Sequence, residues 1–101
     1  MISKFVGCTL NGTDLKAQRE RWIALVERFG TDRRKIADGV RLTFRDDPAV
    51  AAELQALVRT ENHCCGWASW SVEREDGALV MAAHSRGNGV AALQAMFCSV
   101  A

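Results

Sequence analysis

The spacing of apolar residues along the chain predicts three helices. Apolar positions recur every three or four residues over 14–29, and Gly30 follows as a natural stop. Asp47-Pro48 combines an N-cap with proline at the first helical position, which predicts a second helix to about residue 62. A third helix follows a glycine-rich turn near the C-terminus. The inward faces are formed by Leu15, Trp22, Leu25, Val26 and Phe29, by Val50, Leu54, Leu57 and Val58, and by Val90, Leu93, Met96 and Phe97.

Alternation of apolar and polar residues with a period of two predicts strands. Residues 40–44 show this pattern most cleanly, and residues 68–73 show it again. An Asp-Gly dipeptide then predicts a tight hairpin that leads into a strand over 79–84. A short first strand is predicted over 4–10. The resulting order, β-α-β-α-β-β-α, predicts a two-layer α+β domain with a mostly antiparallel four-stranded sheet and helices packed on it.

Composition narrows the class of protein. The 101 residues are 49% hydrophobic and 25% charged, so we expect one globular domain over 1–101. A formal net charge of +1 gives no electrostatic reason to expect nucleic-acid binding. No apolar run reaches the roughly 18 residues of a membrane span, and no stretch of signal-peptide length opens the chain. The expected location is the cytoplasm, where cysteines are more often buried, metal-binding or redox-active than paired.

The most reactive groups gather at the end of the second predicted helix. A carboxyl, an imidazole and two thiols lie within five residues, in the run Glu61-Asn62-His63-Cys64-Cys65. Thiolate and imidazole suit copper(I), zinc and other thiophilic ions. The same groups support thiol redox chemistry. No C-x-x-C is present, which removes the strongest arguments for a zinc ribbon or a thioredoxin-type motif.

Cys8 is the third cysteine of the candidate metal site. Neighbouring side chains in an extended segment point to opposite faces, so Cys64 and Cys65 share one ion only where the backbone is irregular, as Gly66 favours. If the first predicted strand is central, Cys8 approaches the pair and a trigonal pocket of three thiols results. The alternative for these cysteines is that they pack as unreactive thiols, as we expect for Cys98.

Glu61 and His63 are expected to surround the ligands of the ion. Glu61 continues the apolar face of the second helix, and a buried carboxyl there needs a partner, for which Arg41, Arg45, a thiol, a backbone amide or a metal ion are candidates. His63 also fits a solvated helix end. Trp67 and Trp70 follow the cysteine pair, where their indoles either cover one side of the site or pack in the core.

Four segments resemble a known group of proteins: Cys8-Thr9-Leu10 before an arginine-rich helix, the strand from Gly39 to Phe44, the Glu61-x-x-Cys64-Cys65 junction and the closing helix from Gly89 to Phe97. They are similar to small, mostly uncharacterised bacterial proteins found beside or fused to regulators of the mercury-resistance (MerR) type. In that group Pro-Phe-Leu usually follows the cysteine pair, where this chain has Gly66-Trp67-Ala68. The resemblance implies heavy-metal sensing, sequestration or detoxification, with a MerR-type regulator as a possible partner.

Three functions are therefore open. The first is binding of mercury, copper(I), zinc or a similar soft ion by Cys8, Cys64 and Cys65, for sequestration or detoxification. The second is a thiol redox protein in which one of these cysteines is oxidised and another resolves it. The third is a non-catalytic ligand-binding or interaction domain linked to a transcriptional regulator. No nucleophile triad, carboxylate pair or phosphate loop is recognisable, so no catalytic residue is predicted.

Overall fold

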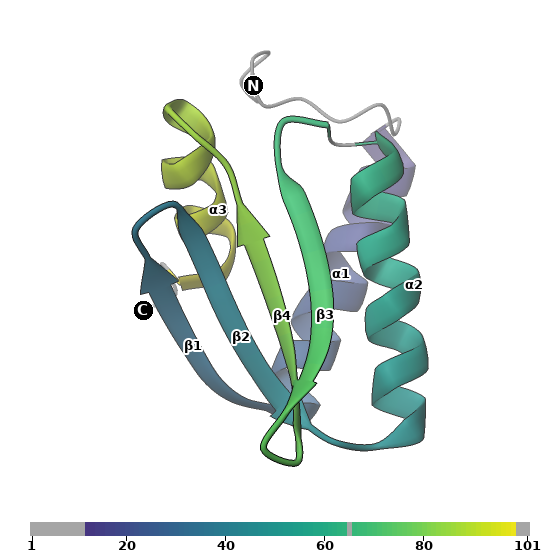
Figure 1. Cartoon of the computed structure of the whole chain (residues 1–101). Helices are drawn as coiled ribbons and strands as arrows, with labels where there is room; N and C mark the ends of the chain where they lie inside the picture. The colour runs from purple at the N-terminus through teal and green to yellow at the C-terminus, as the bar shows by residue number, and fades with distance from the viewer. Residues whose placement is uncertain (1–11, 65, 99–101) are drawn as a thin grey trace.

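The computed structural model describes residues 12–64 and 66–98. Helices and strands follow one another in the order α1 (Gly12–Phe29), β1 (Gly30–Ile36), β2 (Gly39–Arg45), α2 (Pro48–Cys64), β3 (Ser69–Glu75), β4 (Ala78–His84) and α3 (Asn88–Cys98). The chain thus runs twice through a helix followed by a hairpin and closes with a third helix (Figure 1). No helix in these ranges is long and apolar enough to cross a membrane.

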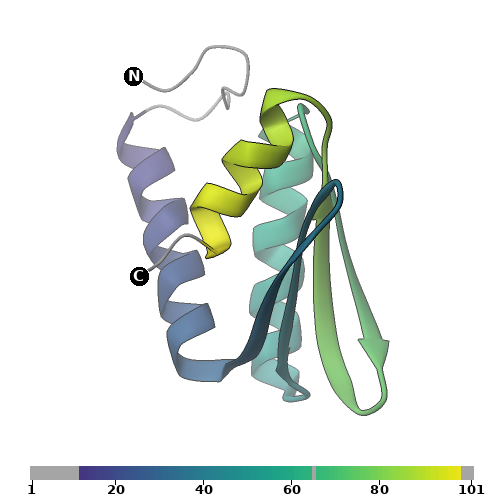
Figure 2. The same cartoon turned by 90° about the vertical axis from the view of Figure 1, so that its left-hand side faces the viewer.

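The four strands form one antiparallel sheet in the order β1-β2-β4-β3. The two hairpins join through β2 and β4, which lie at the centre of the sheet. All three helices lie on the same face of this sheet (Figure 2). The α+β class, the two layers and the antiparallel four-stranded sheet predicted from the sequence are confirmed.

Local sequence signals explain where most of these elements begin and end. Asp47 caps α2 because its Oδ1 accepts hydrogen bonds from the amides of Ala49 at 2.8 Å and Val50 at 3.4 Å. Asp76 and Gly77 both adopt positive φ, which the tight turn between β3 and β4 requires. Both the predicted N-cap and the predicted hairpin are confirmed.

Helix α1 ends at Phe29, as the predicted stop at Gly30 requires, but strand β1, which begins at Gly30, was not predicted. Its sequence, GTDRRKI, carries no alternating apolar pattern, because β1 lies at an edge of the sheet and most of its side chains are exposed. Charges on such an edge discourage pairing with other chains. Gly30 allows the abrupt change from helix to strand, since a Cβ there would lie 2.5 Å from the Val26 carbonyl oxygen. The predicted strand over 4–10 lies outside the described residues.

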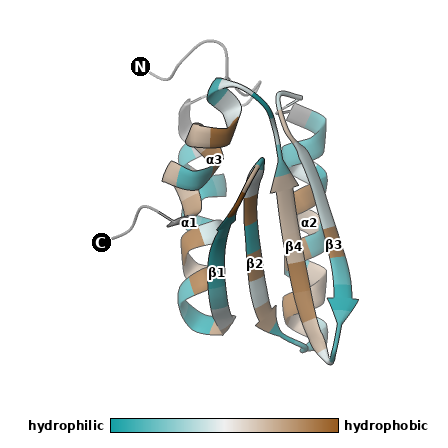
Figure 3. Cartoon of the chain, turned by 60° about the vertical axis from the view of Figure 1, so that its left-hand side comes forward, coloured by the Kyte–Doolittle hydropathy of each residue, from teal (hydrophilic) through white to brown (hydrophobic). Residues whose placement is uncertain are grey.

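The core lies between the helices and the inner face of the sheet. Figure 3 shows the brown apolar segments of β2 and β4 at the centre of the sheet, beside the teal edge strand β1. The indoles of Trp22 and Trp70 stack with their ring centroids 5.9 Å apart, and each packs against Phe97 in a T-shaped arrangement. Met96 was predicted to point inward but is 42% exposed, because Leu93 and Phe97 form the inward face of α3.

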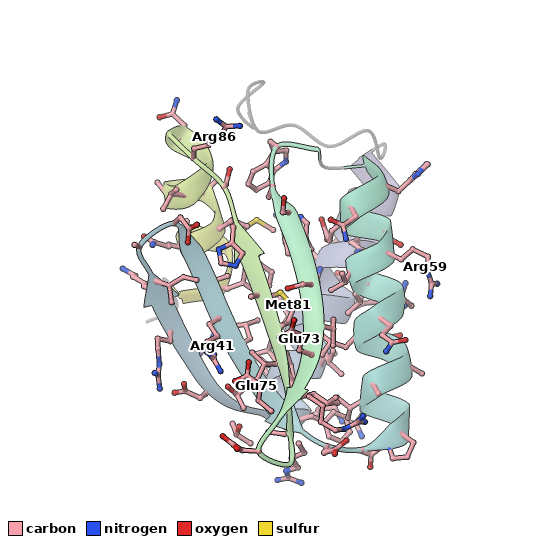
Figure 4. The ribbon with its side chains drawn as sticks, viewed as in Figure 1. Arg41, Arg59, Glu73, Glu75, Met81 and Arg86 are labelled. Carbon is pink, nitrogen blue, oxygen red and sulfur yellow. The ribbon has the colours of Figure 1, made fainter. Side chains whose placement is uncertain are left out.

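The outer face of the sheet carries charged side chains. Arg41 on β2 and Glu75 on β3 form an ion pair across β4, and both side chains lie on the face turned to the viewer in Figure 4. Val80 lies between them on β4 and is 6% exposed. Long charged side chains thus cover the small apolar residues of the outer face.

Candidate functional site

The candidate site begins at the C-terminus of α2. This helix runs to Cys64, two residues beyond the end predicted from the sequence. Cys8, Cys65 and the side chain of Cys64 lie outside the described part of the structure, so their predicted convergence stays a prediction. What the structure does describe is how the residues on both sides of the cysteine pair are held.

Glu61 is buried one turn before Cys64. Its side chain is 4% exposed, and its Oε2 accepts hydrogen bonds from Trp22 Nε1 at 2.8 Å and Gln18 Nε2 at 3.0 Å. The predicted burial of Glu61 at the end of the apolar face is confirmed. The arginine partners were wrong: Arg41 pairs with Glu75, on the opposite face of the sheet from the helices.

These hydrogen bonds attach α1 to the last two turns of α2. Gln18 Nε2 also contacts the carbonyl oxygen of Leu57 at 3.2 Å, so one amide group bonds both the backbone and a side chain of α2. Gln18 is itself buried, as is Trp22. A polar group in this position keeps the two helices in one register, because sliding either helix would leave buried N–H groups without acceptors.

Asn62 fixes the other side of the cysteine pair. Its Nδ2 donates to the carbonyl oxygen of Trp70 at 3.0 Å, and its Oδ1 accepts from the amide of Trp70 at 3.1 Å. The asparagine amide therefore bonds the free edge of β3 in the way a neighbouring strand would. Asn62 and Trp70 are eight positions apart in the chain, and their hydrogen bonds close the loop that contains Cys64 and Cys65.

The two tryptophans after the cysteine pair have different surroundings. Trp70 belongs to the core through its contacts with Trp22 and Phe97. Trp67 is half-buried, packs against the edge of the core and lines an open pocket beside Gly66. Core packing therefore accounts for Trp70, whereas Trp67 lies at the surface next to the candidate site. The indole Nε1 of each is buried without a hydrogen-bond partner among the described residues.

The two histidines also differ. His63 is exposed on α2 and has no hydrogen-bond partner in the part of the chain described, as expected of a solvated helix end. His84, which ends β4, places Nδ1 2.9 Å from Asp38 Oδ1. This hydrogen bond lowers the pKa of the Asp38 carboxyl from its ordinary value.

A groove of about 710 Å³ lies between α1, β1 and α3. Ile23 and Met96 line it and are 48% and 42% exposed. Trp22 forms part of its wall, while the Nε1 of the same indole bonds Glu61. Trp22 therefore both lines the groove and, through Glu61, holds the end of α2. The described residues that line the groove form no cluster of His, Cys, Asp and Glu side chains that could hold a metal ion.

Comparison of the chain with protein-family models, with curated proteins and with solved structures finds no match. The resemblance to small proteins associated with MerR-type regulators therefore stays a prediction. Within residues 12–64 and 66–98, no three His, Cys, Asp or Glu side chains gather as a metal-binding group. The metal site predicted from Cys8, Cys64 and Cys65 depends on thiols that lie outside that description.

Sequence reasoning missed three supporting residues of this site. Gln18 occupies the gap in the apolar face of α1 one turn before Trp22, and this polar interruption was the available signal for a buried partner of Glu61. Asn62 and Asp38 gave no comparable signal. Their roles depend on strand β3 and on the β1-β2 hairpin lying close by in space.

Proposed function

We propose that this protein binds a soft metal ion through the thiolates of Cys8, Cys64 and Cys65, for sequestration or detoxification. The observation that carries the proposal is the way the structure fixes both sides of the cysteine pair: Glu61 is held before it and Trp70 after it. A short segment bearing two thiols loses less conformational entropy on binding an ion when its flanks are already ordered.

The bonding of Glu61 supports a role beside the ion rather than on it. Its Oε2 already accepts two N–H donors from α1, so the side chain serves to hold the end of α2 in place. We expect Glu61 and His63 to lie around the ligands, with sulfur as the principal donor. Residues that orient the ligands of a metal typically affect its affinity about 10–100-fold.

We also propose a cellular compartment, a partner and an ion for this protein. Thiolates require a reducing compartment, which fits the cytoplasm. A regulator of the MerR type is the expected macromolecular partner, and the bound ion would be mercury, copper(I) or zinc. Metal binding releases the protons of the coordinating thiols, so the affinity for the ion rises with pH.

Titration of the reduced protein with mercury(II), copper(I) and zinc tests the proposal. Mercury(II) and copper(I) are followed by thiolate-to-metal absorption, and zinc by competition with a chromophoric chelator. We expect one ion per chain, loss of this stoichiometry in the Cys64→Ser/Cys65→Ser double variant, and a weaker complex in Cys8→Ser. Cys98→Ser is the matched control, because this cysteine is predicted to take no part, and it should bind like the natural chain.

Unchanged stoichiometry in the double variant would contradict metal binding by the pair. The redox function makes a different prediction, namely a reversible intramolecular disulfide and one thiol that is alkylated much faster than free cysteine at neutral pH. Alkylation rates measured on the metal-free protein therefore distinguish the two functions in the same preparation.

A further inference from the structure

Two exposed apolar side chains border the groove between α1, β1 and α3. Ile23 of α1 is 48% exposed and Met96 of α3 is 42% exposed, and both line the groove. Figure 2 shows the end of α3 between α1 and β1. The volume of about 710 Å³ lies within the range of small-molecule sites, about 300–1,000 Å³. Exposed apolar side chains around a groove of this size favour a ligand with an apolar body.

Arg33 brings a positive charge into this groove. It is paired with the buried Leu42 in the register of β1 with β2, so its side chain lies on the face of the sheet that the helices cover. Its Nη1 donates to the carbonyl oxygen of Phe97, in the last turn of α3, at 3.3 Å. This bond holds the guanidinium at the end of α3, and the remaining N–H groups of the guanidinium are available to an anion. Arg33 forms no ion pair with a carboxylate of residues 12–64 or 66–98.

The two acidic residues that line the groove limit the charge of its ligand. Asp32 pairs with Arg34 at 3.1 Å, and these two side chains lie on the opposite face of β1 from Arg33. Glu27 is exposed on α1, one turn after Ile23, and its negative charge disfavours a second anionic group in the ligand. The charges of the groove therefore fit a ligand with a single anionic group, placed at Arg33.

We propose that the groove binds a small molecule of the fatty-acid type, with an aliphatic chain and one carboxylate. The carboxylate accepts hydrogen bonds from the guanidinium of Arg33, whose planar arrangement of N–H groups matches it. The aliphatic chain packs against Ile23, Val26 and Met96, and the flexible thioether of Met96 adapts to its shape. The site contains no cysteine, so it is independent of the proposed metal binding.

Octanoate is the probe, and 1-octanol and octylammonium are the controls that have the same chain but no negative charge. In a protein labelled with ¹³C at the methionine methyl groups, the Met96 signal should shift saturably with octanoate. The Met81 signal should stay in place, because this side chain is fully buried. We expect octanoate to bind at least about 10-fold more tightly than 1-octanol or octylammonium, because only the carboxylate gains charge-assisted hydrogen bonds.

Substitutions of Arg33 test the source of this preference. Arg33→Met keeps an apolar stem without the charge, so it should bind octanoate at least about 10-fold more weakly and no more tightly than 1-octanol. Arg33→Lys keeps the charge and should keep a preference for octanoate. Arg34→Met is the matched control, because Arg34 is on the same strand but faces away from the groove, and it should bind octanoate like the natural chain.

Four results would overturn the proposal. An equal loss of affinity for octanoate and 1-octanol in Arg33→Met would show that Arg33 only holds α3. Tighter binding of octylammonium than of octanoate would assign the selecting charge to Glu27. The absence of a saturable shift at Met96 would show that the groove does not bind this class of ligand. A dimer of the natural chain that does not bind octanoate, and that Met96→Asp dissociates in sedimentation, would identify a second copy as the occupant of the groove.

Discussion

Glu61 is the residue on which the local arrangement at the end of α2 most depends. Its carboxyl is the common acceptor for the side chains of Trp22 and Gln18. We expect Glu61→Leu to lower the free energy of unfolding by about 1–3 kcal/mol, because the Trp22 N–H is left buried without an acceptor. Gln18 keeps its second bond, to the Leu57 carbonyl, so its loss is smaller.

Urea unfolding of Glu61→Leu and of Glu73→Leu measures this effect against a control. Glu73 is exposed on β3 and has no described partner, so its replacement should change the free energy of unfolding by no more than about 0.5 kcal/mol. An equal change in both variants would show that the bonds to Glu61 contribute nothing to stability.

At this scale the sequence could predict that Glu61 is buried but not what it bonds. Burial followed from its place in the series Val50, Leu54, Leu57, Val58, since positions three and four apart share a helix face. The partner is Trp22 together with Gln18, 39 and 43 residues away in the chain. Charge alone suggested an arginine, whereas the packing of α1 against α2 brought neutral donors to the carboxyl.

Asn62 is the link between α2 and β3. We expect Asn62→Ala to lose two hydrogen bonds to the Trp70 backbone and to destabilise the fold by about 1–3 kcal/mol. Hydrogen exchange at the Trp70 amide should become faster, because this group lies on the free edge of β3. Thr60→Ala is the control: its hydroxyl donates to the Ala56 carbonyl within α2, so exchange at Trp70 should be unaffected. Slow exchange in Asn62→Ala would contradict the link.

A second link, between α1 and α2, makes stability depend on pH. Arg21 contacts both carboxylate oxygens of Glu53, at 3.0 and 2.7 Å, and these hydrogen bonds lower the pKa of Glu53. A lowered pKa in the folded state means that the stabilisation is complete above the ordinary glutamate range and is lost as the pH falls through the lowered pKa. The pair is partly exposed, so it should contribute only about 0.2–1 kcal/mol.

Chemical unfolding of the natural chain and of Glu53→Gln, at neutral pH and near about pH 3, tests this link. The difference between the two proteins should be present at neutral pH and shrink in acid. A difference that is the same at both pH values would mean that the ion pair is not its source.

The strands show which elements the sequence can predict and why. Residues 40–44 and 68–73 alternate because one face of each strand packs on the helices and the other meets solvent. Strand β1 has no such pattern, since it is held by backbone pairing to β2 at the edge of the sheet. Its existence depends on Gly30 and on the turn at residues 37–38 more than on any side-chain preference.

For the molecule as a whole, the α+β fold class could be predicted from the sequence, but the order of the strands in the sheet could not. The antiparallel sheet with helices on one face follows from three alternating or apolar strands and three amphipathic helices. The order β1-β2-β4-β3 requires the pairing of β2 with β4, which joins residues about 40 positions apart and leaves no local signal. This same pairing brings His84 beside Gly39 and next to Asp38.

We propose that Cys8 and the cysteines at the end of α2 together bind one thiophilic ion. X-ray absorption at the zinc edge tests it most directly, on the reduced full-length chain loaded with one equivalent of zinc. We expect three sulfur neighbours at about 2.3 Å, one from each of Cys8, Cys64 and Cys65. A zinc environment with only nitrogen and oxygen neighbours would contradict it.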